Sequence, residues 1–137
     1  MNIAVVYQSR GGLTKKVADA IASGLHTAAW SVEEVKDLEC DLLFLGGGVY
    51  PTGLDKKLKK FLKALEPHSA KKVVLFGTSA GGRKPFGMMK ALLERKCVFV
   101  DDTFFYAPGQ FLFLNKGRPN ADDLTKAEEW AKAFITR

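Results

Sequence analysis

The sequence has few residues of the kinds that build metal sites and redox dithiols. It contains two cysteines, Cys40 and Cys97, which lack CxxC spacing, and two isolated histidines, His26 and His68. No cluster of these residues with carboxylates predicts a metal site. We therefore expect two reduced and buried thiols, as is usual in a cytoplasmic protein.

Long apolar runs are missing as well. No run approaches the ~20 residues that a membrane-spanning helix needs, and no signal peptide opens the chain. With 137 residues, of which 47% are hydrophobic, the sequence is long enough to bury one core. We expect a single domain over residues 1–137 with no membrane span.

Three phosphate-related motifs are absent. The P-loop pattern G-x-x-x-x-G-K-[ST] does not occur, and neither does G-x-G-x-x-G after the first apolar run. The Cys-x5-Arg loop of phosphatases is missing too. These absences argue against binding of nucleoside triphosphates and dinucleotides.

One catalytic pattern is present. Residues 77–81 read G-x-S-x-G, which is typical of the nucleophile in α/β-hydrolases. That fold needs an acid and then a histidine after the serine, but both histidines precede Ser79. Because a serine without its base is a weak nucleophile, the sequence argues against hydrolysis.

The chain is basic, with a formal net charge of +6 and a pI of about 9.4. Lysines cover one side of a helix that we expect over residues 54–65; they are Lys56, Lys57, Lys59, Lys60 and Lys63. Two interpretations stay open, a solvated helix face and a docking surface for an acidic partner protein. No basic strand with interleaved aromatics is present, so nucleic acid is not an expected partner.

Strand-like and helix-like segments alternate along the chain, which indicates a parallel sheet covered on both faces. We expect strands at residues 2–7, 28–32, 41–45 and 72–76, and interrupted strand pieces at 97–100, 104–106 and 111–113. Helices are expected at residues 15–25, 54–65 and 85–95, and a last helix after an N-cap at Asn120. The predicted fold is a three-layer α/β domain, a doubly wound parallel sheet of order 2-1-3-4-5 with a short second strand, which binds ligands at the carboxyl ends of its strands.

The segment after the first strand is suited to an anion. It reads Ser9-Arg10-Gly11-Gly12-Leu13-Thr14 and opens directly into a helix. Free backbone N–H groups and the positive end of the helix dipole favour a phosphate at such a place. Gly11 and Gly12 let the backbone close around the anion, and Ser9 and Thr14 add hydroxyl donors. From residue types alone, a phosphate site and a plain turn both remain open.

This segment, S-x-G-G-x-T, resembles the phosphate loop of the flavodoxin family, whose usual form is [TS]-x-T-G-x-T. Gly11 replaces the middle threonine, so one hydroxyl donor is lost. The resemblance implies a flavodoxin-like fold and assigns the phosphate to FMN. It extends over nearly the whole chain, since residues 115–120 resemble the G-x-P-N segment that leads into the last flavodoxin helix.

The resemblance also implies two flavin loops. The first, at residues 46–53, would lie against the isoalloxazine ring, with Tyr50 stacked on it and Pro51 restricting a peptide flip. The second, at residues 77–84, would bind the pyrimidine edge through backbone N–H groups, and it lacks the usual aromatic, which leaves one ring face open. Arg83 and Lys84 either stabilise the reduced flavin or form a solvated pair. The implied FMN-binding residues are Ser9, Arg10, Gly11, Gly12, Leu13, Thr14, Gly47, Gly48, Val49, Tyr50, Pro51, Thr52, Gly53, Thr78, Ser79, Ala80, Gly81, Gly82 and Arg83.

Three functions are compatible with these features. The first is an FMN-binding electron-transfer protein that shuttles electrons between a reductase and a partner oxidoreductase. The second is an FMN-dependent oxidoreductase that acts on a small substrate, such as a quinone or a porphyrinogen, at the open flavin face. The third is a flavin-free scaffold that binds a partner protein. We take electron transfer as the leading hypothesis, because it needs only a flavin near the strand ends and a suitable potential.

Overall fold

The computed structural model describes residues 1–50, 53–79, 84–109 and 116–136, with only the backbone described at residues 49, 50, 79, 84 and 85. Strands and helices alternate in these residues. The strands are β1 (Ile3–Gln8), β2 (Ala29–Ser31), β3 (Cys40–Tyr50), β4 (Gly53–Leu54), β5 (Ala70–Ser79) and β6 (Val100–Pro108). The helices are α1 (Leu13–Gly24), α2 (Lys56–Ala64), α3 (Lys84–Glu94) and α4 (Ala121–Thr136).

The main strands form one parallel sheet in the order β2-β1-β3-β5-β6. Without the short β4, this is the doubly wound order that the sequence predicts, and the predicted fold is confirmed. The second strand is indeed short, at three residues. The sequence did not predict β4, a two-residue strand that pairs antiparallel with the end of β3.

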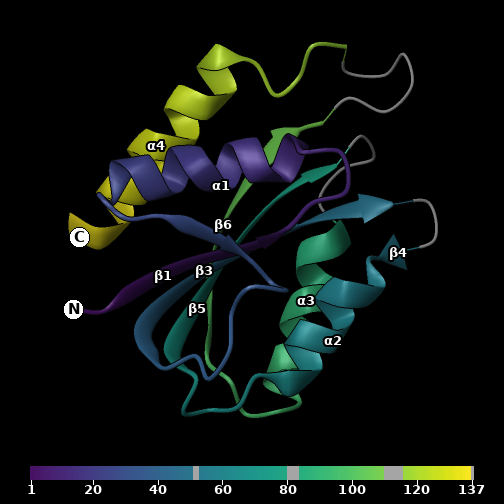
Figure 1. The fold of residues 1–137 in the computed structure, drawn as a ribbon, viewed down its shortest axis with the longest axis vertical. Coiled ribbons are helices and arrows are strands. Elements are labelled where there is room, and N and C mark those ends of the chain that lie inside the picture. The colour runs from purple at the N-terminus through teal and green to yellow at the C-terminus, as the bar shows by residue number, and fades with distance from the viewer. Residues whose placement is uncertain (51–52, 80–83, 110–115, 137) are drawn as a thin grey trace.

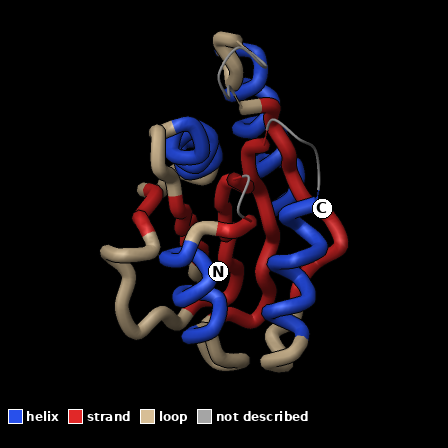
Figure 2. The backbone as a smooth tube through the Cα atoms, turned by 90° about the vertical axis from the view of Figure 1, so that its right-hand side faces the viewer, coloured by secondary structure: helices blue, strands red, loops and turns tan. Residues whose placement is uncertain are grey.

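Helices cover both faces of the sheet. Helices α1 and α4 lie together on one face, and α2 and α3 lie together on the other (Figure 1). In Figure 2, which is viewed from the side of α2 and α3, these helices stand in front of the red strands. No helix in the described ranges combines the length and the apolar character that a bilayer crossing requires.

Each face of the sheet buries its own hydrophobic cluster, as expected for parallel strands covered on both sides. Along β3, Leu43 and Leu45 belong to the cluster under α2 and α3. The alternate residues Leu42 and Phe44 belong to the cluster under α1 and α4. Phe44 meets Trp130 of α4 edge to face, with ring centroids 5.7 Å apart. This double burial fixes β3 as the central strand.

Strands β3 and β5 extend further than the sequence predicts, so the predicted ends at residues 45 and 76 are wrong. The glycines that suggested turns lie inside the strands, where close packing requires them. A Cβ at Gly46 would lie 2.1 Å from the Phe76 ring, and one at Gly47 would lie 2.3 Å from Leu58 Cδ2. A Cβ at Gly77 would lie 2.4 Å from the carbonyl oxygen of Gly47. The glycines therefore let neighbouring elements approach, and they do not end the strands.

Helix α2 begins at Lys56 and not at Leu54, because Leu54 pairs with Val49 in the β3–β4 ladder. Asp55 stands between the two elements and caps the helix, with its Oδ1 accepting from the backbone N–H of Lys57 at 2.7 Å. An aspartate that directly precedes a helical apolar pattern is a sequence signal for this cap.

Strand β6 is one strand from Val100 to Pro108. Its pairing with β5 shifts register between Val100 and Phe104, which is where the sequence predicts an interruption. Residues 97–99 connect α3 to β6, and the predicted piece at residues 111–113 lies outside the described residues. Cys97 has a φ of 62° and is exposed, which makes the expectation of a buried thiol wrong at this position. Cys40 is buried, as predicted.

The predicted start of the last helix is confirmed. Asn120 Oδ1 accepts from the backbone N–H of Asp123 at 2.9 Å, and Asp123 Oδ2 accepts from the backbone N–H of Asn120 at 2.8 Å. This reciprocal arrangement is a capping box in which Asp123 takes the place of the usual glutamate. Ala127 and Ala131, two residues of the predicted inward face, are completely buried.

Candidate functional site

The carboxyl ends of β1, β3 and β5 meet at one edge of the sheet. Gln8, near the end of β1, pairs with Gly47, and Gly47 pairs with Gly77 of β5. One residue further, Gly48 pairs with Thr78. The three segments that the sequence singled out therefore start from neighbouring strands at the same level of the sheet, as the doubly wound order requires.

The loop between β1 and α1 has the geometry of an anion site. Gly12 has a φ of 89°, a left-handed conformation that favours glycine. Ser9 Oγ accepts from the backbone N–H of Gly12 at 2.9 Å, which closes the loop. Since a hydroxyl can accept and donate at once, the Ser9 hydrogen stays available to a ligand.

The amino end of α1 carries no side-chain cap within the described residues. The matching ends of α2 and α4 are capped by Asp55 and Asn120. The first N–H groups of a helix need partners from outside the helix. Apart from its chain neighbours, a Cβ built at Gly11 or Gly12 would meet no atom of the described residues within 4 Å. An open space thus lies beside uncapped donors and the positive end of the helix dipole.

Thr14 connects this loop to β5. Its hydroxyl lies 2.7 Å from that of Thr78, and the two residues are only 2% and 5% exposed. Sequence analysis identified both threonines, but it gave no reason to pair them, because they are 64 positions apart. The sequence assigned Thr78 through its backbone, whereas in the structure its side chain contacts Thr14 in the first turn of α1.

Arg10 connects the same loop to α2. Its Nε donates to Asp55 Oδ2 at 2.7 Å, and the Asp55 side chain is 9% exposed. Burial raises the pKa of Asp55, but the hydrogen bonds from the Arg10 guanidinium and the Lys57 N–H outweigh it, so the net pKa is lowered. The carboxylate stays ionised and holds a cationic side chain beside the loop. Sequence analysis missed Asp55, although its capping position was visible.

The two ends of the first predicted flavin loop pair with each other in antiparallel fashion. Val49 pairs with Leu54 and Tyr50 pairs with Gly53, which has a φ of 103°. Pro51 and Thr52 lie outside the described residues, as does the side chain of Tyr50. Gly47 and Gly48 lie within β3, where Gly47 packs against Leu58 of α2. Stacking by Tyr50 therefore stays a prediction.

The second predicted flavin loop begins at the end of β5. Thr78 and Ser79 are the last residues of that strand, and Lys84 is the first residue of α3. Residues Ala80, Gly81, Gly82 and Arg83 between them lie outside the described residues. The contacts of this segment with a pyrimidine ring likewise stay a prediction.

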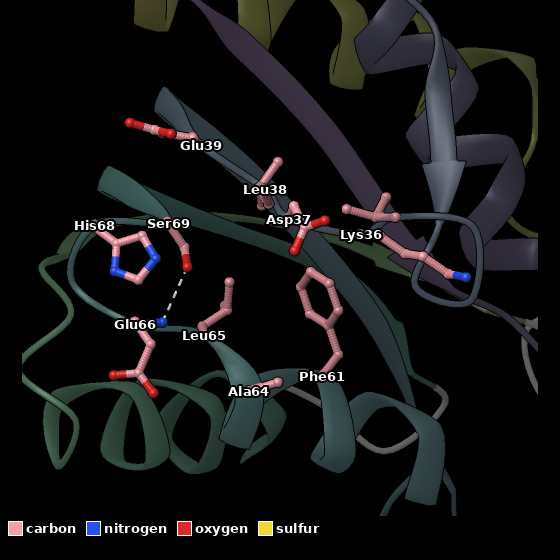
Figure 3. Close-up of a pocket in the computed structure, with 11 residues that line it drawn as sticks. Lys36, Asp37, Leu38, Glu39, Phe61, Ala64, Leu65, Glu66, His68 and Ser69 are labelled. Atoms are coloured by element: carbon pink, nitrogen blue, oxygen red, sulfur yellow. Dashed lines mark hydrogen bonds between the residues drawn. The ribbon is translucent and has the colours of Figure 1, made fainter.

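A cavity of about 560 Å³ lies at the opposite edge of the sheet (Figure 3). It is lined by residues that precede β3 and β5, among them Phe61, Leu65 and His68. Ser69 Oγ accepts from the backbone N–H of Glu66 within it, at 3.1 Å. No group of histidines, cysteines and carboxylates suited to a metal ion occurs in the described part of the chain. This cavity is separate from the β1–α1 loop.

The family model of the flavodoxin domain matches residues 4–110, which is most of the chain. The chain belongs to the flavodoxin family. An uncharacterised protein of Methanocaldococcus jannaschii is 29% identical over 140 aligned positions, covering 89% of each chain. This flavodoxin-family chain is also similar to a solved flavodoxin from the domain Archaea, with 18% identity, a TM-score of 0.72, and 99% and 97% of the two chains covered. For oxidised flavodoxin 2 from Bacillus cereus the identity is 19% and the TM-score is 0.72, with 99% of each chain covered.

The family and the fold support a flavin-binding redox protein of the flavodoxin type. The β1–α1 loop fits the phosphate end of such a ligand in three respects: uncapped helix donors, open space above Gly11 and Gly12, and the cation of Arg10. The family match ends at residue 110. Helix α4, which covers one face of the sheet together with α1, therefore lies outside the matched segment.

Proposed function

We propose that this protein binds FMN and shuttles electrons between a reductase and a partner oxidoreductase. The observation that carries the proposal is the uncapped amino end of α1, which faces open space at Gly11 and Gly12. A monophosphate would receive backbone N–H groups of the loop and the Ser9 hydroxyl, and Arg10 would offset part of its charge.

The flavin ring would lie between the carboxyl ends of β3 and β5, together with the residues that follow them. The residues assigned to it are Gly47, Gly48, Val49, Tyr50, Pro51, Thr52 and Gly53 on one side and Thr78, Ser79, Ala80, Gly81, Gly82 and Arg83 on the other. When bound, FMN supplies the one- and two-electron chemistry of its isoalloxazine ring. The protein supplies binding, orientation and the surrounding charge. Because the sequence lacks a dinucleotide motif, a separate reductase must deliver the electrons.

The partner is proposed to present an acidic surface to α2. Lys56, Lys60 and Lys63 are exposed on this helix, which contains no acidic residue. Of the five lysines on α2, Lys57 forms an ion pair within the described residues, and its partner is Glu33. The helix starts next to the anion loop, since Asp55 caps it and binds Arg10. A basic surface beside the flavin site would steer an acidic partner toward it.

The proposal is tested by titrating the apoprotein with FMN and reducing the complex anaerobically by light. We expect tight binding and two separate one-electron steps. A single two-electron step with turnover of a quinone would favour an FMN-dependent oxidoreductase instead, and absence of binding would leave a flavin-free scaffold.

Gly12→Asp is the matching variant, because it adds a negative charge and a side chain at a φ of 89°. We expect it to abolish FMN binding. Gly117→Asp is the control, since Gly117 also has a positive φ, of 76°, and its Cβ position is open with respect to the described residues. Equal loss of FMN binding in both variants would remove the phosphate-loop assignment.

A further inference from the structure

We infer that Thr78 is a positioning residue for the phosphate loop: its hydroxyl donates to Thr14 Oγ1 and leaves the Thr14 hydrogen free for the ligand phosphate. The inference rests on the proposed FMN function. It gives the Thr78 side chain a role that neither the sequence pattern nor the family match assigns.

The two hydroxyls are held close to each other by separate elements. Thr14 lies in the first turn of α1, and Thr78 lies near the carboxyl end of β5. Their oxygens are 2.7 Å apart, and both residues are almost completely buried. In this dry setting the direction of their hydrogen bond matters, because in the described part of the chain each hydroxyl has the other as its side-chain partner.

The position of Thr78 in a strand restricts its side chain. As a β-branched residue it has few side-chain rotamers, and it is only 5% exposed. Gly109 lies beside it, since a Cβ built at Gly109 would lie 3.3 Å from Thr78 Cβ and 3.6 Å from Leu13 Cδ1 of α1. The Thr78 hydroxyl is thus held beside that of Thr14.

The number of hydroxyl hydrogens on Thr14 and Thr78 determines which of the two donates to the other when a phosphate is bound. Each threonine has one hydroxyl hydrogen and can accept as well as donate, and the 2.7 Å contact uses one of the two hydrogens. An ionised phosphate only accepts. If Thr14 donates to the phosphate, its oxygen can still accept, and Thr78 is the buried donor next to it. Phosphate binding thus fixes the bond in the direction Thr78 to Thr14.

A purely structural role makes a different prediction. If the pair only links α1 to β5, its loss lowers the stability of the apoprotein and weakens every flavin equally. If Thr78 positions the phosphate donor, its loss weakens FMN and spares riboflavin, which has the same ring but no phosphate. The ratio of the two affinities separates the roles.

The experiment measures dissociation constants for FMN and riboflavin, and the thermal midpoint of the apoprotein, for wild type, Thr78→Val, Thr78→Ser, Thr14→Val and the double valine variant. We expect Thr78→Val to weaken FMN binding by roughly tenfold, the scale of one hydrogen bond, with riboflavin affinity unchanged. Thr78→Ser keeps the hydroxyl and should bind FMN within about twofold of wild type. The double variant should be no weaker than Thr14→Val alone, because both changes break one chain of bonds.

Equal weakening of FMN and riboflavin in Thr78→Val, or full FMN affinity in it, would overturn the inference. If Thr78→Val does not fold, a folded Thr78→Ser protein with a tenfold loss specific to FMN would overturn it as well. Failure of the proposed function gives a different result: the wild-type apoprotein itself would not bind FMN. In that case the inference about Thr78 is overturned as well.

Discussion

The Nε of Arg10 lies 2.7 Å from Asp55 Oδ2, and the other oxygen of the same carboxylate caps α2 through the N–H of Lys57. One buried carboxylate therefore joins the anion loop to the helix that carries the basic surface. The pair fixes the position of Arg10 beside the anion loop.

The Asp55 carboxylate should make stability depend on pH. Its pKa is lowered in the folded protein, so its contribution is fully present well above ~3.9, the ordinary value. It is lost as the pH falls through the lowered value. We expect Asp55→Asn to reduce the free energy of unfolding by about 1 kcal/mol at neutral pH, and by less near pH ~3. Urea unfolding at both pH values measures this.

Asp19→Asn is the control for that experiment, because Asp19 forms an ion pair with Lys15 in which both side chains are about half exposed. Such exposed pairs contribute little. A stability difference for Asp55→Asn that is the same at both pH values would show that the charge is not the cause.

The strand glycines should tolerate alanine to different degrees. Gly77→Ala would place its Cβ 2.4 Å from a backbone oxygen, whereas Gly47→Ala would meet the flexible end of Leu58. We expect both to lower the free energy of unfolding, by about 1–3 kcal/mol for Gly47→Ala and by more for Gly77→Ala. Gly87→Ala, on α3 in open space, should be neutral or stabilising by up to ~1 kcal/mol. Chemical denaturation gives all three values, and equal effects would contradict the packing explanation.

Reversing charges on α2 should slow electron transfer to an anionic acceptor. The variant Lys56→Glu/Lys60→Glu/Lys63→Glu changes three exposed lysines. We expect the photoreduced FMN complex to reduce ferricyanide about tenfold more slowly at low salt, with the difference vanishing at high salt. Stopped-flow absorbance measures the rate.

The matched control changes the net charge equally at exposed lysines elsewhere, as Lys71→Glu/Lys126→Glu/Lys132→Glu. The α2 variant should be slower than this control. Equal rates for the two variants would show that net charge alone determines the rate of electron transfer, and would contradict a docking role for α2.

The two cysteines should differ in reactivity. Burial, and to a smaller extent the nearby Asp41 carboxylate, raises the pKa of the Cys40 thiol to about 11, and Cys97 is exposed. A disulfide reagent at neutral pH should label Cys97 rapidly and Cys40 only after unfolding, because the thiolate is the reactive form. Cys97→Ser should abolish the fast phase and leave the slow one. Rapid labelling of two thiols in the native protein would contradict the burial of Cys40.

The order of the strands and helices and the place of the loops follow from local patterns in the amino-acid sequence. Apolar runs such as residues 42–45 are typical of buried strands. The helical spacing of Val17 and Ile21, and that of Leu58 and Leu62, predicts helices with one buried face. The N-cap at Asn120 was also readable, because capping depends on residues next to each other in the chain. These features rest on local periodicity and local hydrogen bonds.

Contacts between residues far apart in the chain depend on how the elements pack together. Gly46, Gly47 and Gly77 looked like turn residues, yet they lie in strands because the Phe76 ring, Leu58 and a backbone oxygen occupy the space of a Cβ. The contacts of Thr14 with Thr78 and of Arg10 with Asp55 join segments 64 and 45 positions apart. Composition and spacing along the chain carry no record of such pairs, because they arise when parallel strands bring their carboxyl ends to one edge.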